Sequence, residues 1–179
     1  HKWLFTPMDC SVLYTRRPDL LKRAFQHIPD YLVVSEGDSV VNLMDYGVAL
    51  GRRFRALKLW FVIRNFGVEG LQSLIREHIR IARQLADEID ANPNLERMAD
   101  VNFSTVVFRH RPPGMSGRDL NAHNEQLLKK VNEAREVYLS HTRVRGSYAL
   151  RVAIGNVHTT EMHTRRALEL VKEAGQALK

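Results

Sequence analysis

Two segments rich in β-branched and aromatic residues lie between helical segments, and this order limits the fold more than any other feature. NFSTVVFRHR (102–111) and YALRVAIGN (148–156) have the composition of β-strands. Helical periodicity precedes the first segment from Trp60 onward, and it returns between the two segments at 119–139. Because no regular βα repeat results, we predict an α+β layer in which helices cover a small, mostly antiparallel sheet.

The longest helical segment lies between Gly67, where we expect a break or kink, and Asn92–Pro93, where we expect the helix to end. Apolar residues recur along it every three or four positions. This stripe predicts a face that packs into the core or against a second subunit, and it comprises Val68, Leu71, Leu74, Ile75, Ile81, Ala82, Leu85 and Ile89.

Shorter elements follow from local signals. Pro18 suits the first turn of a helix, which predicts a short helix at PDLLKRAF. Thr159 is the expected cap of the last helix. A weak additional strand is expected at LERMA (95–99), and residues 3–16 read as two short extended pieces. Residues 26–50 show no helical period, and loops of that length in compact domains tend to be functional or mobile.

Composition excludes several functional classes. The net charge is +7, but lysines and arginines alternate with acidic residues along the helices, so we expect no nucleic-acid partner. No apolar stretch is long enough to cross a membrane. Cys10 is the one cysteine, which excludes an internal disulfide and fits a reducing, cytoplasmic compartment; we interpret it as a small buried apolar residue. The eight histidines are scattered, so no metal site is expected.

Lys2 has the side chain with the most specific chemistry. A lysine becomes a covalent catalyst when burial or nearby cations lower the pKa of its amine, because the neutral amine condenses with aldehydes. His1 would donate to a phosphate or a substrate carboxylate beside it, and Trp3 and Leu4 would exclude water. Taken alone, HKW favours an exposed lysine, because lysine side chains are mostly solvated.

The wider sequence resembles one enzyme family along essentially all 179 residues. HKW at the start and DCS at 9–11 are similar to the segment around the cofactor lysine of the group II pyridoxal-phosphate-dependent amino acid decarboxylases. LGRRFRALKLWFVIRNFGVEGLQSLIREHI (50–79) resembles the family signature that leads into the C-terminal domain, and YALRVAIGN resembles the last strand. The aromatic-L-amino-acid decarboxylases are the most similar branch.

The resemblance implies a cofactor and a catalytic pair. Lys2 matches the lysine that binds pyridoxal 5'-phosphate covalently, and His1 matches its neighbour beside the cofactor. Tyr31 matches the tyrosine of the family's mobile catalytic loop, here about 26–50, which reaches the active site of the other subunit. That tyrosine is the family's proton donor to the substrate carbon, and related aldehyde synthases carry phenylalanine there.

The resemblance also implies residues that act across a homodimer. Leu50 and Gly51 match a dipeptide that approaches the phosphate and the substrate from the partner subunit. Relatives with serine at the Gly51 position tend to differ in substrate preference. Glycine there resembles the aromatic, indole-tolerant type, so we expect an aromatic amino acid substrate.

The family architecture implies that residues 1–59 end the α/β, fold type I large domain and that residues 60–179 form the small C-terminal domain. The large domain supplies most of the cofactor pocket. We therefore expect the chain to be the C-terminal part of a longer enzyme and to be inactive alone. Two alternatives stay open: the same chemistry on glutamate or histidine, and a non-catalytic interaction domain derived from the family.

Overall fold

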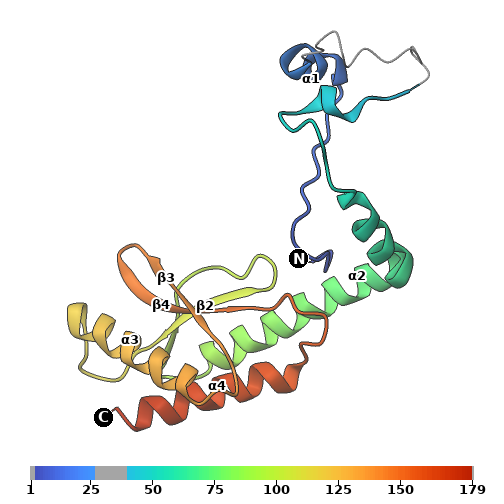
Figure 1. Ribbon diagram of the computed structural model, residues 1–179. Coiled ribbons are helices and arrows are strands. Elements are labelled where there is room, and N and C mark those ends of the chain that lie inside the picture. Colours follow the sequence, from blue (N-terminus) through green and yellow to red (C-terminus); the bar gives the residue numbers. More distant parts are fainter. Residues whose placement is uncertain (1–2, 27–39, 179) are drawn as a thin grey trace. The chain divides into compact units, whose positions relative to one another are not determined.

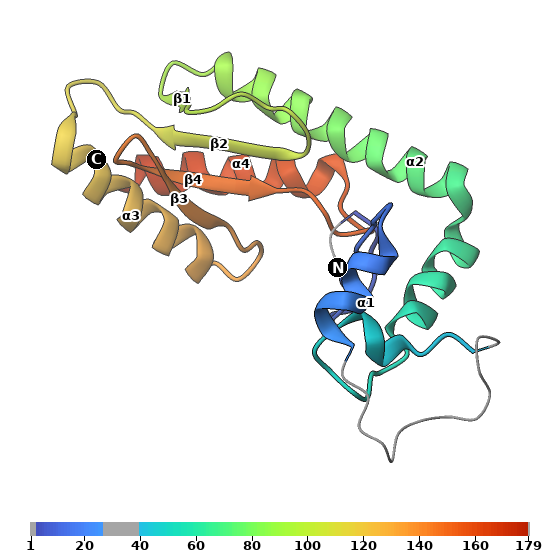
Figure 2. The same ribbon diagram turned by 90° about the horizontal axis from the view of Figure 1, so that it is seen from above.

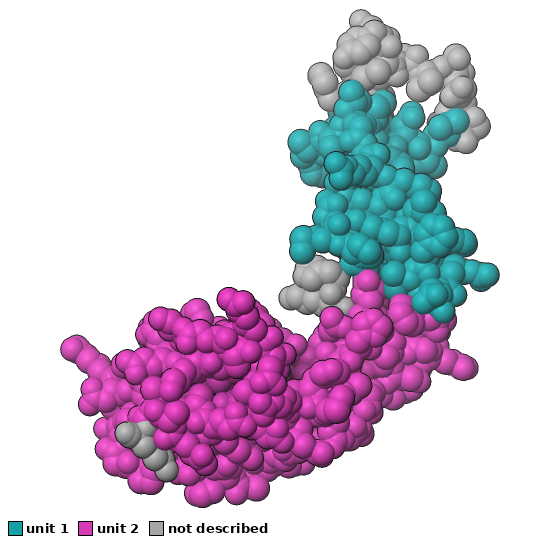
Figure 3. Space-filling view, turned by 60° about the horizontal axis from the view of Figure 1, so that its bottom comes forward, with its two compact units in different colours: residues 1, 6–65 teal, residues 2–5, 66–179 magenta. Residues whose placement is uncertain are grey.

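The structure is a computed structural model that describes residues 3–26 and 40–178. These residues form two compact units, which Figure 3 shows in separate colours. The first unit comprises residues 6–65, and the second comprises residues 3–5 together with 66–178. The predicted border at residues 59 and 60, which refers to the domains of the whole enzyme, stays a prediction.

The first unit contains helix α1 (Pro18–Phe25), the short 3-10 helix η3 (Leu43–Tyr46) and the start of helix α2. The prediction of α1 is confirmed, with proline in its first turn. Lys22 Nζ lies 5.4 Å from the centre of the Tyr46 ring, and Gln26 Nε2 donates to Asp45 Oδ2 at 3.4 Å, so η3 packs against α1. Residues 3–16, where two short extended pieces were expected, contain turns and bends but no β-strand, so this segment joins no sheet.

Helix α2 extends from Arg55 to Asp90 and is interrupted at Gly67, where φ is 67° and ψ is 172°. Glycine adopts a positive φ without the steric cost that a Cβ would add. The expected break at this residue is therefore confirmed. Most of the predicted stripe beyond it is core, since Leu71, Ile81, Ala82, Leu85 and Ile89 are buried. Its first member, Val68, is 65% exposed, so the stripe is wrong as a core face at that end.

The second unit contains one antiparallel sheet of four strands in the order β1-β2-β4-β3. The strands are β1 (Leu95–Arg97), β2 (Thr105–His110), β3 (Ser140–Val144) and β4 (Ser147–Ala153). Val106 pairs with Val152 across β2 and β4, and His141 pairs with Leu150 across β3 and β4. The predicted strands β2 and β4 and the weaker β1 are confirmed, whereas β3 was not predicted.

Helix α3 (Gly117–Glu133) ends before the predicted boundary at Leu139. Arg135 has a φ of 58°, which a right-handed helix does not accommodate. The Asn132 side chain then holds the turn, since its Oδ1 accepts from the Leu139 N–H at 2.9 Å and its Nδ2 donates to the Leu139 carbonyl at 3.0 Å. Arg145 and Gly146, with φ of 49° and 81°, form the tight turn between β3 and β4.

Helix α4 (Glu161–Gln176) begins after Thr160, one residue later than the predicted cap Thr159. The Thr160 N–H donates to Nδ1 of His163 at 3.0 Å, which satisfies one free donor at the helix start. The helices α2, α3 and α4 cover one face of the sheet (Figures 1 and 2). That face supplies most of the apolar core, including Val106, Phe108, Leu150 and Val152. No helix in the described parts of the chain is long and apolar enough to span a membrane.

Candidate active site

The residues predicted to bind the cofactor fall partly outside the described chain. His1, Lys2 and Tyr31 lie outside the described residues. Leu50 and Gly51 are described, and they lie in an exposed segment of the first unit, where Leu50 is 64% exposed. The site is therefore built from the residues that flank Lys2 and from the segment around Gly51.

The segment that follows Lys2 is anchored by aromatic contacts in the second unit. Trp3 packs edge-on against Phe103, with ring centres 5.4 Å apart at an angle of 87°. The Phe5 ring lies 5.8 Å from Phe66 and 6.0 Å from His78. We call these five residues the anchor cluster. Leu4, expected to exclude water, is 46% exposed, so this shielding role is not seen within the chain.

Phe5 adopts an uncommon backbone conformation within the anchor cluster. Its φ is 49°, in the left-handed region that bulky residues seldom occupy. Such a conformation persists when surrounding contacts hold it in place. The rings of Phe66 and His78 provide these contacts, so packing defines the path of the chain three residues after Lys2.

His78 is the functional candidate that the sequence did not reveal. Its side chain is 1% exposed, and neither ring nitrogen forms a well-aligned hydrogen bond within the described residues. Burial lowers the pKa of His78, and the Asn156 backbone and the Glu77 carboxylate oppose this shift in part. Its position in the sequence could have identified it. His78 falls on the apolar stripe of α2, between Leu71 and Ala82, where a polar residue is unexpected.

The two motifs that carry the resemblance meet within the first unit. Arg55 Nε donates to Asp9 Oδ2 at 2.8 Å, and Lys58 Nζ lies 3.8 Å from Asp9 Oδ1. The hydrogen bond from Arg55 lowers the pKa of the Asp9 carboxyl below its ordinary value. Asp9 therefore stays ionised and links the DCS motif to the long signature. Cys10 beside it is partly exposed, so the expectation that it is buried is wrong.

Gly51 is unconstrained by its own chain. A Cβ placed on it would meet no atom within 4 Å, and its φ lies outside the left-handed region. Gly47 differs, because a Cβ there would overlap the guanidinium of Arg52. The guanidinium is the far end of a flexible, exposed side chain that can move away, so packing within this chain excludes a side chain at neither Gly47 nor Gly51.

A buried histidine pair lies in the core of the second unit. His110 Nδ1 and His123 Nε2 are 2.7 Å apart, and the two rings stack with centres 5.0 Å apart. Burial lowers the pKa of His123. Both rings are mostly inaccessible to solvent, and one proton shared between the facing nitrogens satisfies them, so we assign the pair a structural role.

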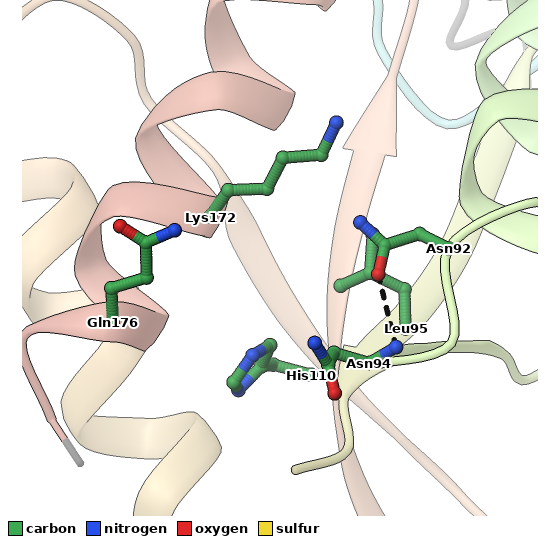
Figure 4. Close-up of a pocket in the computed structure, with 6 residues that line it drawn as sticks. All are labelled: Asn92, Asn94, Leu95, His110, Lys172 and Gln176. Carbon is green, nitrogen blue, oxygen red and sulfur yellow. Dashed lines mark hydrogen bonds between the residues drawn. The ribbon is translucent and has the colours of Figure 1, made fainter.

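A small hollow of about 130 Å³ opens beside this pair (Figure 4). Asn92 Oδ1 accepts from the Asn94 N–H at 2.9 Å on one side of it, and Lys172 and Gln176 extend toward it from α4. Leu95 and His110 complete the lining. It contains none of the residues predicted to bind cofactor or substrate.

The donor chemistry of the chain fits pyridoxal phosphate. An aldehyde cofactor requires a primary amine, for which Lys2 is the predicted residue, and a hydrogen-bond donor for its phosphate, for which His1 is the predicted residue. The anchor cluster beside these residues also holds a buried polar atom, Trp3 Nε1, that has no partner among the described residues. Among the described residues, no group of three or more His, Cys, Asp or Glu side chains is placed to hold a metal ion.

Comparison with known proteins defines the family. Residues 1–111 match the pyridoxal-dependent decarboxylase conserved domain. The chain is 41% identical to tryptophan decarboxylase TDC2 of Camptotheca acuminata over 99% of its length, and it covers 36% of that protein. It is 37% identical to phenylacetaldehyde synthase of Arabidopsis thaliana, with 99% of this chain and 37% of the relative covered.

A solved structure agrees with these sequence matches. The crystal structure of Oryza sativa TDC with PLP and tryptamine superposes with a TM-score of 0.81 at 33% identity, over 87% of this chain and 33% of that one. The chain belongs to the pyridoxal-dependent decarboxylase family. The predicted family and its cofactor are thereby confirmed, and the chain spans about a third of the length of these relatives.

Proposed function

We propose that the enzyme of which this chain is a part decarboxylates an aromatic L-amino acid to the amine and carbon dioxide with pyridoxal phosphate. The observation that carries this proposal is the family match over residues 1–111, which contain every predicted site residue. The relatives support the aromatic class, since one of them is a tryptophan decarboxylase and a solved neighbour holds tryptamine.

Lys2 and His1 are the proposed cofactor ligands within this chain. A neutral amine at Lys2 binds the cofactor aldehyde, and the His1 side chain donates to the phosphate. The bound cofactor supplies an electron sink for the electron pair that carbon dioxide leaves behind. The anchor cluster holds Trp3 and Phe5 by packing, which would restrain the neighbouring Lys2 while substrate is exchanged.

Tyr31 is the proposed proton donor. Its hydroxyl would deliver a proton to the substrate carbon after carbon dioxide leaves, as a general acid within hydrogen-bonding reach. The loop of residues 26–50 would close over the partner subunit's site and exclude water during that step. The similarity to a phenylacetaldehyde synthase makes aldehyde formation the second candidate reaction. Tyrosine rather than phenylalanine at this position favours the amine.

Leu50 and Gly51 are the proposed contacts to phosphate and substrate across the dimer. Leu50 is exposed in this chain, as a residue that acts on a partner subunit must be. No atom of this chain lies within 4 Å of a Cβ placed on Gly51, and we infer that a glycine there leaves room for a wide aromatic ring in the assembled site. Gly51 would thus set substrate size without affecting the packing of its own unit.

The surface of the first unit supports the proposed partners. Thr6 and Asp45 are its only buried residues in the described chain, so it has no apolar core of its own there. Large apolar side chains are exposed instead, including Met8, Leu13, Tyr14, Val48 and Phe54. Surface of this kind is typical of an interface. We assign it to the N-terminal large domain, whose last part would be residues 1–59, and to the second subunit of a cytoplasmic homodimer.

The test uses the full-length enzyme with candidate amino acids. Amine release measured by chromatography should be highest with an aromatic substrate such as tryptophan. Tyr31→Phe should divert product from amine toward aldehyde, because the proton donor is removed and the carbon is left open to oxidation by dioxygen. Clean amine formation by that variant would refute the role of Tyr31, and release from glutamate or histidine alone would refute the substrate class.

A further inference from the structure

His78 touches the segment that carries Lys2, although 76 positions of sequence separate the two residues. We propose that His78 is a positioning residue of the active site: its ring holds Phe5 and thereby sets the path of the chain that leads from Lys2. The inference rests on the proposed role of Lys2 and adds to it a residue of the C-terminal unit. His78 is not proposed to touch cofactor or substrate.

The contact between the two rings is well defined. Phe5 and His78 pack edge-on at an interplanar angle of 86°, with ring centres 6.0 Å apart. Aromatic pairs favour this arrangement because the positive edge of one ring meets the negative face of the other. His78 itself belongs to the uninterrupted part of α2 that lines the core, so it presents a rigid surface to Phe5.

Phe5 needs such a surface. Its left-handed φ of 49° is unfavourable for a residue with a Cβ, so removal of its contacts would let it return to an ordinary conformation. That change would rotate the chain by which Phe5 is joined to Lys2 through Trp3 and Leu4. Phe66 contributes a second contact, but its ring is tilted at 52° and lies next to the break at Gly67.

The ring acts through its shape and its aromatic edge. Its nitrogens have no well-aligned partner among the described residues, and the contact to Phe5 is made between rings. An aromatic replacement should therefore preserve the function, whereas loss of the ring should not.

The experiment uses the full-length enzyme loaded with pyridoxal phosphate. The quantity measured is the pH midpoint of the visible absorbance of the Lys2-bound cofactor, which reports the surroundings of the lysine nitrogen. His78→Ala and Phe5→Leu should each move this midpoint by about half a pH unit or more, since small changes of geometry and solvation alter a pKa by that amount. The double variant should move it no further than the larger single effect.

Two further variants separate positioning from general stability. His78→Phe keeps an aromatic edge and should hold the midpoint close to that of the unaltered enzyme. Val131→Ala removes a buried core side chain of α3, so it should lower the thermal midpoint without moving the pH midpoint. A purely structural role for His78 would give the Val131→Ala pattern in His78→Ala.

The possible results separate the role of His78 from the proposed function of the enzyme. An unchanged pH midpoint in both His78→Ala and Phe5→Leu would overturn the proposal, as would a His78→Phe enzyme that behaves like His78→Ala. If His78→Ala does not fold, Phe5→Leu decides alone, because an unchanged midpoint there leaves His78 nothing to act through. Absence of any lysine-bound cofactor in the unaltered enzyme would instead refute the proposed function itself.

Discussion

Asn124 holds both backbone groups of His110 with one side chain. Its Oδ1 accepts from the His110 N–H at 2.8 Å, and its Nδ2 donates to the His110 carbonyl at 2.8 Å and to the Leu120 carbonyl at 2.9 Å. Asn124 is 0% exposed, so no water replaces these bonds. The end of β2 is therefore fastened to α3 by a buried amide that mimics a neighbouring strand.

Asn124→Ala should lower the free energy of unfolding by about 2–4 kcal/mol, because it removes two hydrogen bonds to the buried backbone of His110. Denaturant unfolding of the full-length enzyme, followed by circular dichroism, measures this change. Asn102→Ala, at an exposed position, is the matched control and should have little effect. Equal stability of the two variants would contradict the account of this contact.

Replacement of glycine by alanine should have opposite effects on stability at two helical positions, Gly175 and Gly70. A Cβ at Gly175 would lie 2.7 Å from His110 Nε2, so Gly175→Ala should destabilise the enzyme by displacing that ring. A Cβ at Gly70 would lie 3.7 Å from Phe66 Cβ, which is an ordinary contact. Gly70→Ala should therefore stabilise α2 by about 0.5–1 kcal/mol through helix propensity. Thermal unfolding compares them, and the same sign for both would refute the prediction.

The buried histidines predict a pH dependence of stability. Burial lowers the pKa values of His78 and His123 in the folded protein, so the unfolded chain takes up protons first as the solution is acidified. The free energy of unfolding should be largest above the ordinary histidine pKa of 6.5 and should fall as the pH decreases below it toward the lowered values. Denaturant unfolding between neutral pH and about pH 5 tests this dependence.

Two variants test whether His78 contributes to the pH dependence of stability. His78→Phe should make the acid slope shallower, because one titrating group is lost from the buried set. Val131→Ala should lower the whole curve and keep its slope, since it removes no titrating group. A slope unaffected by His78→Phe would mean that this residue does not contribute to the acid sensitivity.

Gly51→Ser should change substrate preference without changing stability. The space around the Gly51 Cα is open in this chain, so a serine side chain meets no atom of its own unit. In the assembled enzyme it would reduce the room for an indole ring, and kcat/KM for tryptophan should fall relative to that for tyrosine. An extra or missing small group in a pocket changes kcat/KM by about 10–200-fold. An unchanged ratio would remove Gly51 from the substrate site.

Several elements of the fold could be predicted because their signals are local. Strand β2 alternates between buried and partly buried residues, and α1 opens on proline, so composition and periodicity reveal both. Strand β3 (SHTRV) has no fully buried residue, since it lies at the edge of the sheet and needs no apolar face. Its pairing with β4 depends on a distant partner, which periodicity does not report.

The end of α3 shows the same limitation. Ala134 and Val137 continue the apolar period beyond Glu133, and Val137 does pack against the core, but from the irregular segment that follows the helix. The amide of Asn132 and the left-handed Arg135 redirect the chain there. Tertiary contacts, rather than helix propensity, set this boundary.

The candidate site was accessible to sequence only through the resemblance. The assignment of Lys2 depends on matching motifs, because a lone lysine is most often solvated. His78 was not found, since its contact with Phe5 joins residues that no short motif contains. Structure adds what the motifs lack, namely which side chains hold the reactive segment in place.

Chemical fixation of the cofactor identifies the lysine that binds it. The full-length enzyme is loaded with pyridoxal phosphate, treated with borohydride to fix the cofactor to its lysine, digested, and analysed by mass spectrometry. A phosphopyridoxyl group should appear on the peptide that contains Lys2 and should be lost in Lys2→Ala. A phosphopyridoxyl group on another lysine, or on none, would contradict this role of Lys2.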